Sequence, residues 1–331
     1  MDVLLGHRYR TTALIGSGGA ASVYRAVDEN LGREVAVKLF SAGVHGDDET
    51  RRQQTEMQLL ATLNHPGLVT LLDAGVNIGE DGKASSYLVM ELVDGPDLRG
   101  KLKEGPLTSS ATAALGADLA DALNYVHSNG VIHRDVKPAN ILLFPQEDQD
   151  TKLYPRLTDF GIARMVEATV ATAHGATIGT ANYLSPEQAQ GAAVDPRTDI
   201  YSLGLVLLEC LTGEKAFPGP IVEAAVARLL RDPEIPDWVG PDWTSILRAM
   251  TSRLVDARPE AHEVAVALRT LASEALLLDG PEVSAPAADA APGNPGNPLT
   301  GDPLTGDSAT GGITTGNIYI PAPPPHAPSL G

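Results

Sequence analysis

The stretch His133-Arg134-Asp135-Val136-Lys137-Pro138-Ala139-Asn140, followed by Asp159-Phe160-Gly161, decides how this sequence is interpreted. Phosphoryl transfer from ATP uses one Asp to orient an acceptor hydroxyl and an Asn a few positions later to hold a metal ion. A second Asp, here 24 positions after the first, binds metal between the phosphates. A single triplet could arise by chance, but the ordered set indicates phosphoryl transfer.

Length and composition are those of a soluble enzyme. The 331 residues predict one large or two modest domains, and no apolar run reaches the ~18–20 residues that span a bilayer. The N-terminus lacks the basic-then-apolar order of a signal peptide, so we expect a cytoplasmic protein without a membrane span. The single cysteine, Cys210, lies in an apolar stretch and is expected to be a buried packing residue. A net charge of -18 argues against nucleic-acid partners, which need basic patches.

Composition changes sharply near residue 279. Pro, Gly, Ala, Asn and Thr dominate after it, and none of the 24 Lys and Arg residues lies there. Such a segment cannot bury enough apolar area to offset the entropy of ordering it. We therefore expect residues 279–331 to form a disordered, acidic tail.

The part before the tail divides by its hydrophobic pattern. Strand-like runs at 9–15, 22–28, 34–40 and 87–92 surround one helical stretch at 48–63. Helical patterns follow at 109–129, 197–212, 221–231 and 261–278. The sequence thus predicts an α+β fold with two lobes. Residues 1–8 would be an N-terminal extension, 9–93 a small β-rich lobe and 94–278 a larger helical lobe.

A Gly-rich run and a strand lysine point to an anionic ligand in the small lobe. Gly16-Ser17-Gly18-Gly19 lies between two strand-like runs, where glycines let backbone amides approach phosphates, although such a run alone is more often a simple turn. Lys38 ends the apolar run Val35-Ala36-Val37 and points inward only if an anion receives it; alone, it would be read as exposed. Together the two features favour ATP phosphates. Glu56 on the next helix is the preferred carboxylate for Lys38, ahead of Glu49 and Glu80.

These motifs together resemble the protein-kinase superfamily, specifically the bacterial eukaryotic-like Ser/Thr kinases found in actinobacteria, over about residues 9–276. The resemblance implies a bilobal kinase fold that uses ATP and Mg²⁺. It implies Asp135 as catalytic base, Lys137 at the γ-phosphate, Lys38 at the α- and β-phosphates paired with Glu56, and Asn140 and Asp159 as magnesium ligands. It implies an ATP site formed by Ile15, Gly16, Ser17, Gly18, Gly19, Val23, Ala36 and Leu142, with Met90 as gatekeeper and Glu91 to Val93 as hinge. Ala21 departs from the family's Gly-rich pattern at its third position.

The resemblance also implies structural and regulatory roles. Glu187 of Ser185-Pro186-Glu187 would pair with Arg258, and Asp199 would brace the catalytic loop. Arg134, directly before Asp135, is typical of kinases switched by phosphorylation of the segment between residues 159 and 187. Thr172 is the expected phosphorylation site, and Thr180 would hydrogen-bond Asp135 and Lys137. An ordinary polar loop would contain threonines as well.

Three classes of function are compared. An active Ser/Thr protein kinase is favoured, because a pseudokinase scaffold would lack one of the core Lys, Asp or Asn residues. A small-molecule phosphotransferase of related fold usually lacks the Ser-Pro-Glu element and the lysine two positions after the catalytic Asp. The expected partners are protein substrates, a second copy of the chain for phosphorylation between copies, and a phosphothreonine-binding protein recruited by the tail. A spacer role for the tail is the alternative to the last.

Overall fold

The computed structural model describes residues 3–18, 21–40, 61–79, 82, 84–144, 153–159 and 181–278, without the side chains of 181, 221 and 275–278. The chain divides into two compact units, Met1–Pro281 and Glu282–Gly331. The second unit lies outside the described residues. The same holds for most of the helix expected over 48–63 and for the disorder expected from residue 279.

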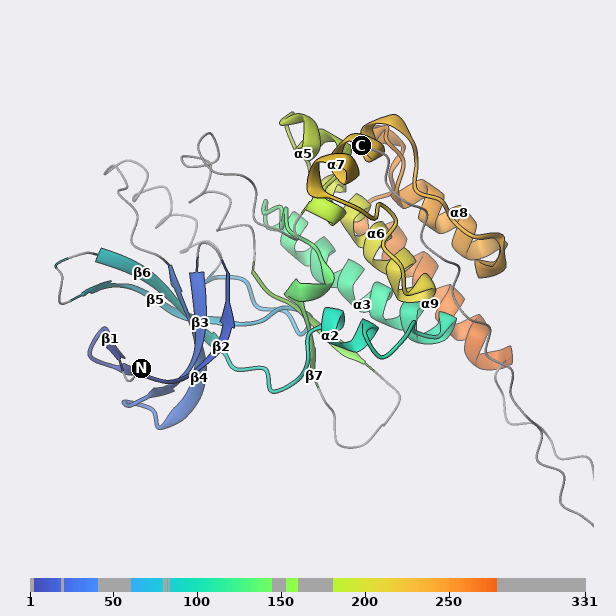
Figure 1. Cartoon of the computed structure of the whole chain (residues 1–331). Helices are drawn as coiled ribbons and strands as arrows, with labels where there is room; N and C mark the ends of the chain where they lie inside the picture. The colour runs from blue at the N-terminus through green and yellow to red at the C-terminus, as the bar shows by residue number, and fades with distance from the viewer. Residues whose placement is uncertain are drawn as a thin grey trace, which may run out of the picture. The chain divides into compact units, whose positions relative to one another are not determined.

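One antiparallel sheet of six strands occupies the N-terminal part of the described chain (Figure 1). Its strands are β1 Leu4–Leu5, β2 Tyr9–Ser17, β3 Ala21–Asp28, β4 Arg33–Phe40, β5 Leu71–Ile78 and β6 Ala84–Glu91, in the order β1-β2-β3-β4-β6-β5. The four strands expected from the sequence are β2, β3, β4 and β6. The pair β1–β2 draws residues assigned to an N-terminal extension into the sheet, where Leu5 is fully buried.

The turn between β3 and β4 sets the register that places Lys38. Asp28 is fully buried, and its Oδ1 accepts the backbone N–H groups of Asn30 and Leu31 at 3.2 and 3.3 Å. Gly32 closes the turn with φ +65°, a left-handed conformation that costs glycine little. Arg8 donates to both carboxylate oxygens of Asp28 at 2.8 Å, so the buried charge is paired.

The C-terminal part is helical apart from one hairpin (Figure 1). Its α-helices in the described ranges are α2 Leu98–Leu102, α3 Ser109–Ser128, α5 Pro186–Gln190, α6 Arg197–Thr212, α7 Ile221–Leu230, α8 Pro241–Met250 and α9 Ala261–Leu278. The hairpin is β7 Ile141–Phe144 with β8 Tyr154–Leu157, and short 3₁₀ turns are η1 Pro138–Asn140, η2 Ala181–Tyr183, η3 Asp237–Val239 and η4 Val255–Ala257. The long helices α3, α6, α7 and α9 begin where the sequence predicts and end within a residue of it.

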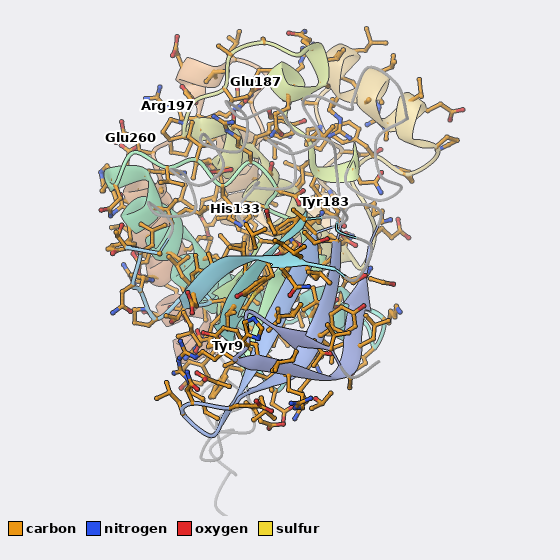
Figure 2. All side chains as sticks on the ribbon, turned by 90° about the vertical axis from the view of Figure 1, so that its left-hand side faces the viewer. Tyr9, His133, Tyr183, Glu187, Arg197 and Glu260 are labelled. Atoms are coloured by element: carbon orange, nitrogen blue, oxygen red, sulfur yellow. The ribbon has the colours of Figure 1, made fainter. Side chains whose placement is uncertain are left out.

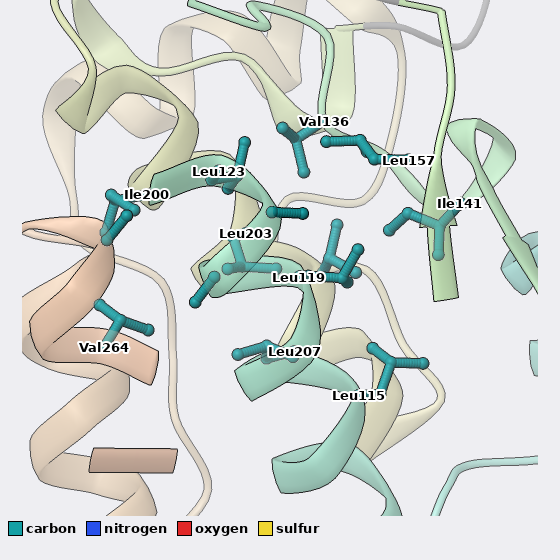
Figure 3. Packing of buried hydrophobic residues seen from close by; sticks show 14 of the residues in the cluster. Leu115, Leu119, Leu123, Val136, Ile141, Leu157, Ile200, Leu203, Leu207 and Val264 are labelled. Atoms are coloured by element: carbon teal, nitrogen blue, oxygen red, sulfur yellow. The ribbon is translucent and has the colours of Figure 1, made fainter. Parts of the chain in front are cut away.

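The core lies where α3, α6 and α9 meet (Figure 3). Leu119, Leu203 and Leu207 are buried there, and burying each such side chain stabilises the fold by about 1.5–3 kcal/mol. A Cβ on Gly116 would lie 2.8 Å from Leu268 and 2.9 Å from Leu207, so only glycine lets the three helices approach this closely. The core thereby fixes the end of α3, which leads into the loop before β7, and the start of α6, which carries Asp199 against that loop.

Helix α6 is buried from Thr198 to Leu211, which explains its apolar sequence. Cys210 is fully buried on it, and burial raises the pKa of its thiol. The prediction of a packing cysteine is confirmed. None of the helices in the described ranges is both long and apolar enough to cross a bilayer.

Candidate active site

The loop between α3 and β7 gathers the polar residues of the first motif. Lys137 Nζ lies 2.7 Å from Asp135 Oδ2. Asn140 Nδ2 donates to the same oxygen and to the backbone carbonyl of Asp135, both at 2.9 Å. The 3₁₀ turn η1 begins with Pro138, whose fixed φ suits the first position of a helix, and brings Asn140 back over Asp135. One carboxylate oxygen therefore receives donors from two side chains of the same loop.

Asp199 supports this loop from α6. Its fully buried carboxylate accepts the backbone N–H groups of His133 at 2.8 Å and Arg134 at 2.7 Å, and His127 Nε2 lies 2.9 Å away. Arg134 has φ +65°, a conformation that costs a non-glycine residue on the order of 1 kcal/mol or more. Bonds from N–H groups to a carboxylate are among the stronger hydrogen bonds and offset that strain. The prediction that Asp199 braces the loop is confirmed.

His133 joins the catalytic loop to the end of β8. It is fully buried, its Nδ1 accepts the N–H of Asp135 at 3.2 Å, and its Nε2 donates to the carbonyl of Thr158 at 3.0 Å. Burial lowers the pKa of His133, outweighing the carboxylate of Asp199 that raises it. Burial thus favours the neutral ring, and because Nδ1 accepts, the proton of that neutral ring lies on Nε2. The prediction that it packs and hydrogen-bonds, rather than exchanging protons with substrate, agrees with this geometry.

Lys38, on β4 of the sheet, contacts Asp159, which follows β8 in the helical part. Lys38 Nζ lies 2.8 Å from Asp159 Oδ1, with the two side chains 10% and 29% exposed. Asp159 has φ +61°, so its backbone is held in a strained conformation at the end of the described hairpin segment. The partner expected for Lys38, Glu56, lies outside the described residues. The inward orientation of Lys38 is thus accompanied by a carboxylate from the second motif.

Asn140 and Asp159 are neighbours and form a set of oxygen donors. The N–H of Thr158 donates to the carbonyl of Asn140 at 2.9 Å, which places Asp159 next to that residue. Both hydrogen bonds found for the Asn140 side chain use its Nδ2, so Oδ1 faces no donor in the described part of the chain. An amide oxygen beside one carboxylate fits Mg²⁺, which takes few protein ligands and keeps phosphate and water oxygens. These residues suit a magnesium ion bound together with ATP phosphates.

The register of the sheet aligns the residues expected to contact nucleotide. Gly16 pairs with Val23, Val23 with Lys38, and Ala36 with Met90, in consecutive strands. The N–H of Gly18 donates to the carbonyl of Ala21 at 2.9 Å, closing the end of the β2–β3 hairpin. Ile15 and Ser17 lie on β2, whereas Gly19 lies outside the described residues. Glycine-rich backbone and Lys38 therefore occupy one row of the sheet.

The hinge after β6 is fixed by a side chain. Thr158 Oγ1 lies 3.9 Å from Met90 Sδ, so the expected gatekeeper contacts the residue before Asp159. The carboxylate of Glu91 accepts the N–H of Thr70 at 2.8 Å and pairs with Arg156 of β8. Sequence reasoning placed Glu91 to Val93 in the hinge through backbone groups alone. The side chain of Glu91 also ties the sheet to the β7–β8 hairpin through Arg156. Val93 is buried, and Leu142 of β7 pairs with Arg156 of β8.

The Ser185-Pro186-Glu187 element is bound into the helical part. Arg258 donates to both Glu187 oxygens at 2.7 and 2.9 Å, and Thr198 Oγ1 donates to the first at 2.7 Å. Burial opposes ionisation of Glu187, but these hydrogen bonds prevail and lower its pKa to about 2. The predicted Glu187–Arg258 pair is confirmed. In the view of Figure 2, Glu187 and Arg197 lie toward the top and Tyr9 of the sheet toward the bottom. His133 and Tyr183 lie between these two levels.

Three supporting residues escaped the sequence analysis: Thr158, Thr198 and Gln188. Gln188 Nε2 donates to the carbonyl of Arg134 at 2.9 Å and so ties α5 to the catalytic loop. Its signal was readable, because a Ser followed three positions later by Gln is a capping-box pattern, and Ser185 and Gln188 form that box. Nothing in the sequence marks the two threonines. Thr172 and Thr180 lie outside the described residues.

Comparison of the sequence with known proteins identifies relatives of this chain. A family model described as "Protein kinase domain" matches residues 9–267. The chain is 42% identical to serine/threonine-protein kinase PknB of Mycobacterium leprae over 235 residues, 70% of this chain and 37% of that protein. It is 38% identical to serine/threonine-protein kinase PknL of Mycobacterium bovis over 296 residues, 86% of this chain and 70% of that protein. For PknA of Mycobacterium tuberculosis the identity is 38%, over 71% of this chain and 54% of the relative.

Proposed function

The chain belongs to the protein kinase family, and from this premise we propose that it transfers the γ-phosphoryl group of ATP, with Mg²⁺, to Ser and Thr hydroxyls of proteins. The chain covers only 37% of the length of PknB, so the activity of the whole protein is part of the proposal. The observation that carries it is the meeting of Asp135, Lys137 and Asn140 on one loop, beside the Lys38–Asp159 pair.

Each residue has a role that follows from its position. Asp135 would accept the hydrogen bond of the acceptor hydroxyl and orient it, because its backbone is fixed by His133 and its carboxylate by the loop. Lys38 and Lys137 would offset the negative charge of the transferring group. Asn140 and Asp159 would hold magnesium, which neutralises charge on the phosphates when bound. Positioned charge of this kind is the main requirement of phosphoryl transfer.

Two other classes of function fit less well. A pseudokinase would lack one of the core residues, whereas Lys38, Asp135, Asn140 and Asp159 are all present. A small-molecule phosphotransferase would not need the buried Glu187–Arg258 pair that anchors the segment beside the catalytic loop. The names of the relatives, serine/threonine-protein kinases, favour Ser and Thr over Tyr as acceptors.

The proposal extends to regulation. Arg134 precedes the catalytic Asp, and a phosphate on Thr172 would bring negative charge to it and order the segment. Thr180 would hydrogen-bond Asp135 and Lys137. We propose that one copy of the chain phosphorylates another at Thr172. Threonines of the tail are further acceptors, which once phosphorylated would recruit a phosphothreonine-binding protein.

One experiment tests these statements together. The protein, co-expressed with a phosphatase, is incubated with radiolabelled ATP and a generic protein acceptor, with and without Mg²⁺, and the phosphosites are mapped. We expect Mg²⁺-dependent label on Ser and Thr of the acceptor and on Thr172. The Asp159→Asn variant should bind magnesium-ATP more weakly and transfer less. Label that persists without Mg²⁺, or a folded protein that transfers none, would refute the proposed activity; full activity with Thr172 unmodified would refute the switch alone.

A further inference from the structure

Helix α7 carries an arginine on its buried face and apolar residues on its exposed face. Ala224 and Arg228, four residues apart, are both fully buried. Val222, Val226 and Leu230, on the other face at the same spacing, are 72%, 47% and 73% exposed. This is the reverse of the usual amphipathic pattern, in which charged side chains face water. The buried position of Arg228, where an apolar side chain would be usual, therefore calls for a physical explanation.

The Arg228 guanidinium bonds to backbone carbonyls. Its Nε donates to the carbonyl of Ala224 at 2.9 Å, one turn earlier in α7, and its Nη1 donates to the carbonyl of Leu184. The ring of Phe217 covers its face, with the guanidinium carbon 5.2 Å from the ring centre. Within the described ranges its Nη2 has no hydrogen-bond partner, and no carboxylate pairs with the guanidinium. Burial lowers the pKa of Arg228.

A buried charge without a carboxylate is costly, since desolvation is offset only by neutral acceptors. Packing alone does not explain the residue, because methionine or leucine would fill the volume without that cost. What only an arginine supplies here is a rigid plane. Its Nε is anchored to α7, so the direction of Nη1 is fixed, and with it the carbonyl of Leu184.

Leu184 lies in a segment that is hydrogen-bonded to α6 and α7 and leads into α5. Ser202 of α6 donates to the carbonyl of Tyr183 at 2.7 Å, and the Tyr183 hydroxyl donates to Glu209 of the same helix. The next residue, Ser185, caps α5, and α5 reaches the catalytic loop through Gln188. Two successive carbonyls, of Tyr183 and Leu184, are thus held by two different helices. That fixes the peptide unit between them.

We propose that Arg228 is a positioning residue for the protein acceptor: by holding the Leu184 carbonyl it sets residues 183–185 as the surface on which the acceptor chain lies beside its reacting hydroxyl. The inference rests on the proposed kinase activity, since it concerns the acceptor of that reaction. Residues 183–185 lead into α5, whose Gln188 donates to the carbonyl of Arg134, the neighbour of Asp135, so this segment is the adjoining surface we assign to an acceptor whose hydroxyl reaches Asp135. Arg228 touches neither acceptor nor nucleotide and acts through Leu184.

The test compares the two arginines that lie over the Phe217 ring, Arg228 and Arg231. Arg231 also covers the Phe217 ring, at 5.1 Å, but is exposed and donates to no carbonyl of residues 183–185 in the described chain. Arg228→Met should raise the KM for a peptide acceptor about tenfold or more, the effect of losing one charged hydrogen bond, and leave the KM for ATP within about twofold. Arg231→Met should change neither constant. Arg228→Lys keeps the charge but reaches only one carbonyl, so its peptide KM should lie between.

Folding and activity are separated by a second readout. Thermal unfolding shows which variants are folded, and if Arg228→Met is not, Arg228→Lys against Arg231→Met decides. Hydrogen exchange at the amides of residues 183–185 should quicken in the Arg228 variants and not in Arg231→Met. A folded Arg228 variant with the peptide KM and exchange of Arg231→Met would overturn the inference. If the unmodified protein phosphorylates nothing, the proposed function fails, and the exchange result still decides whether Arg228 holds Leu184.

Discussion

The Lys38–Asp159 pair of the candidate active site and the Glu187–Arg258 pair of the helical part each join one basic side chain to one carboxylate, but they differ in how many hydrogen bonds each carboxylate accepts. Lys38 and Asp159 are joined by one contact at 2.8 Å, and the Asp159 side chain is 29% exposed. Glu187 and Arg258 are joined by two hydrogen bonds, Thr198 adds a third, and the pair is buried. The partly exposed Lys38–Asp159 pair leaves room for either side chain to take a phosphate or a metal ion as partner instead, as the proposed function requires. The buried pair has no such freedom, which suits a scaffold.

The Asp135–Lys137 pair is also partly exposed and stands with Lys38–Asp159 in this comparison. Asp135→Asn is the strongest test of these active-site pairs. The amide keeps the shape of the side chain but cannot accept the acceptor's proton, so turnover with protein substrates should fall about 10²–10⁴-fold. Steady-state kinetics measures this, and nucleotide titration should show ATP binding still present. Chemical denaturation should show almost no loss of stability. Near-parental turnover would remove Asp135 from its proposed role.

Arg258→Met tests the buried Glu187–Arg258 pair. Removing one partner leaves the Glu187 carboxylate buried and uncompensated, so the free energy of unfolding should fall by about 3–5 kcal/mol. Urea denaturation measures it. Arg253→Met is the matched control, because Arg253 pairs with Asp232 at 3.0 Å on the surface and should cost under about 1 kcal/mol.

A double variant sharpens that result. Glu187→Gln with Arg258→Met removes both charges and should be more stable than Arg258→Met alone, because no buried charge is left. Equal destabilisation by Arg253→Met and Arg258→Met would contradict the distinction between surface and buried pairs.

The smallest expected effect is the loss of folding stability at acidic pH. Glu187 has its pKa lowered from 4.5 to about 2, so the pair's contribution is fully present above pH 4.5 and is lost as the pH falls toward 2. At pH 3.5 the loss relative to neutral pH should be on the order of 1 kcal/mol. Other carboxylates titrate in the same range, so the measured quantity is the difference in acid sensitivity between the natural chain and the double variant. An identical pH dependence would show that Glu187 does not contribute.

Features set by residues close together in the sequence were predictable, whereas features that depend on contacts between distant segments mostly were not. α6 and α9 were predicted to the residue because their apolar patterns are continuous. β5 was missed, because Asp73, Gly75 and Asn77 disfavour strands and only pairing with β6 at the sheet edge forms it. The sequence motif placed Asp135 and Asn140 together, since they are five positions apart in one turn.

Contacts between distant segments were predictable only where a family resemblance supplied them. The Glu187–Arg258 pair was expected on that ground and is present. The hydrogen bonds of Glu91 with Thr70, of Gln188 with Arg134 and of Arg228 with Leu184 were not expected, because each depends on how separate helices and strands pack. The catalytic and nucleotide-binding roles themselves stay predictions.

One imidazole ring lies between the segments that carry Asp135 and Asp159. His133 accepts from the N–H of Asp135 at one nitrogen and donates to the carbonyl of Thr158, the residue before Asp159, at the other, so the width of the ring spaces Asp135 from the segment that carries Asp159. Protonating the ring would remove the first of these bonds, and burial suppresses protonation. In this motif His133 therefore acts as a spacer between two segments rather than as a charged group, and its burial favours the neutral form that makes both hydrogen bonds.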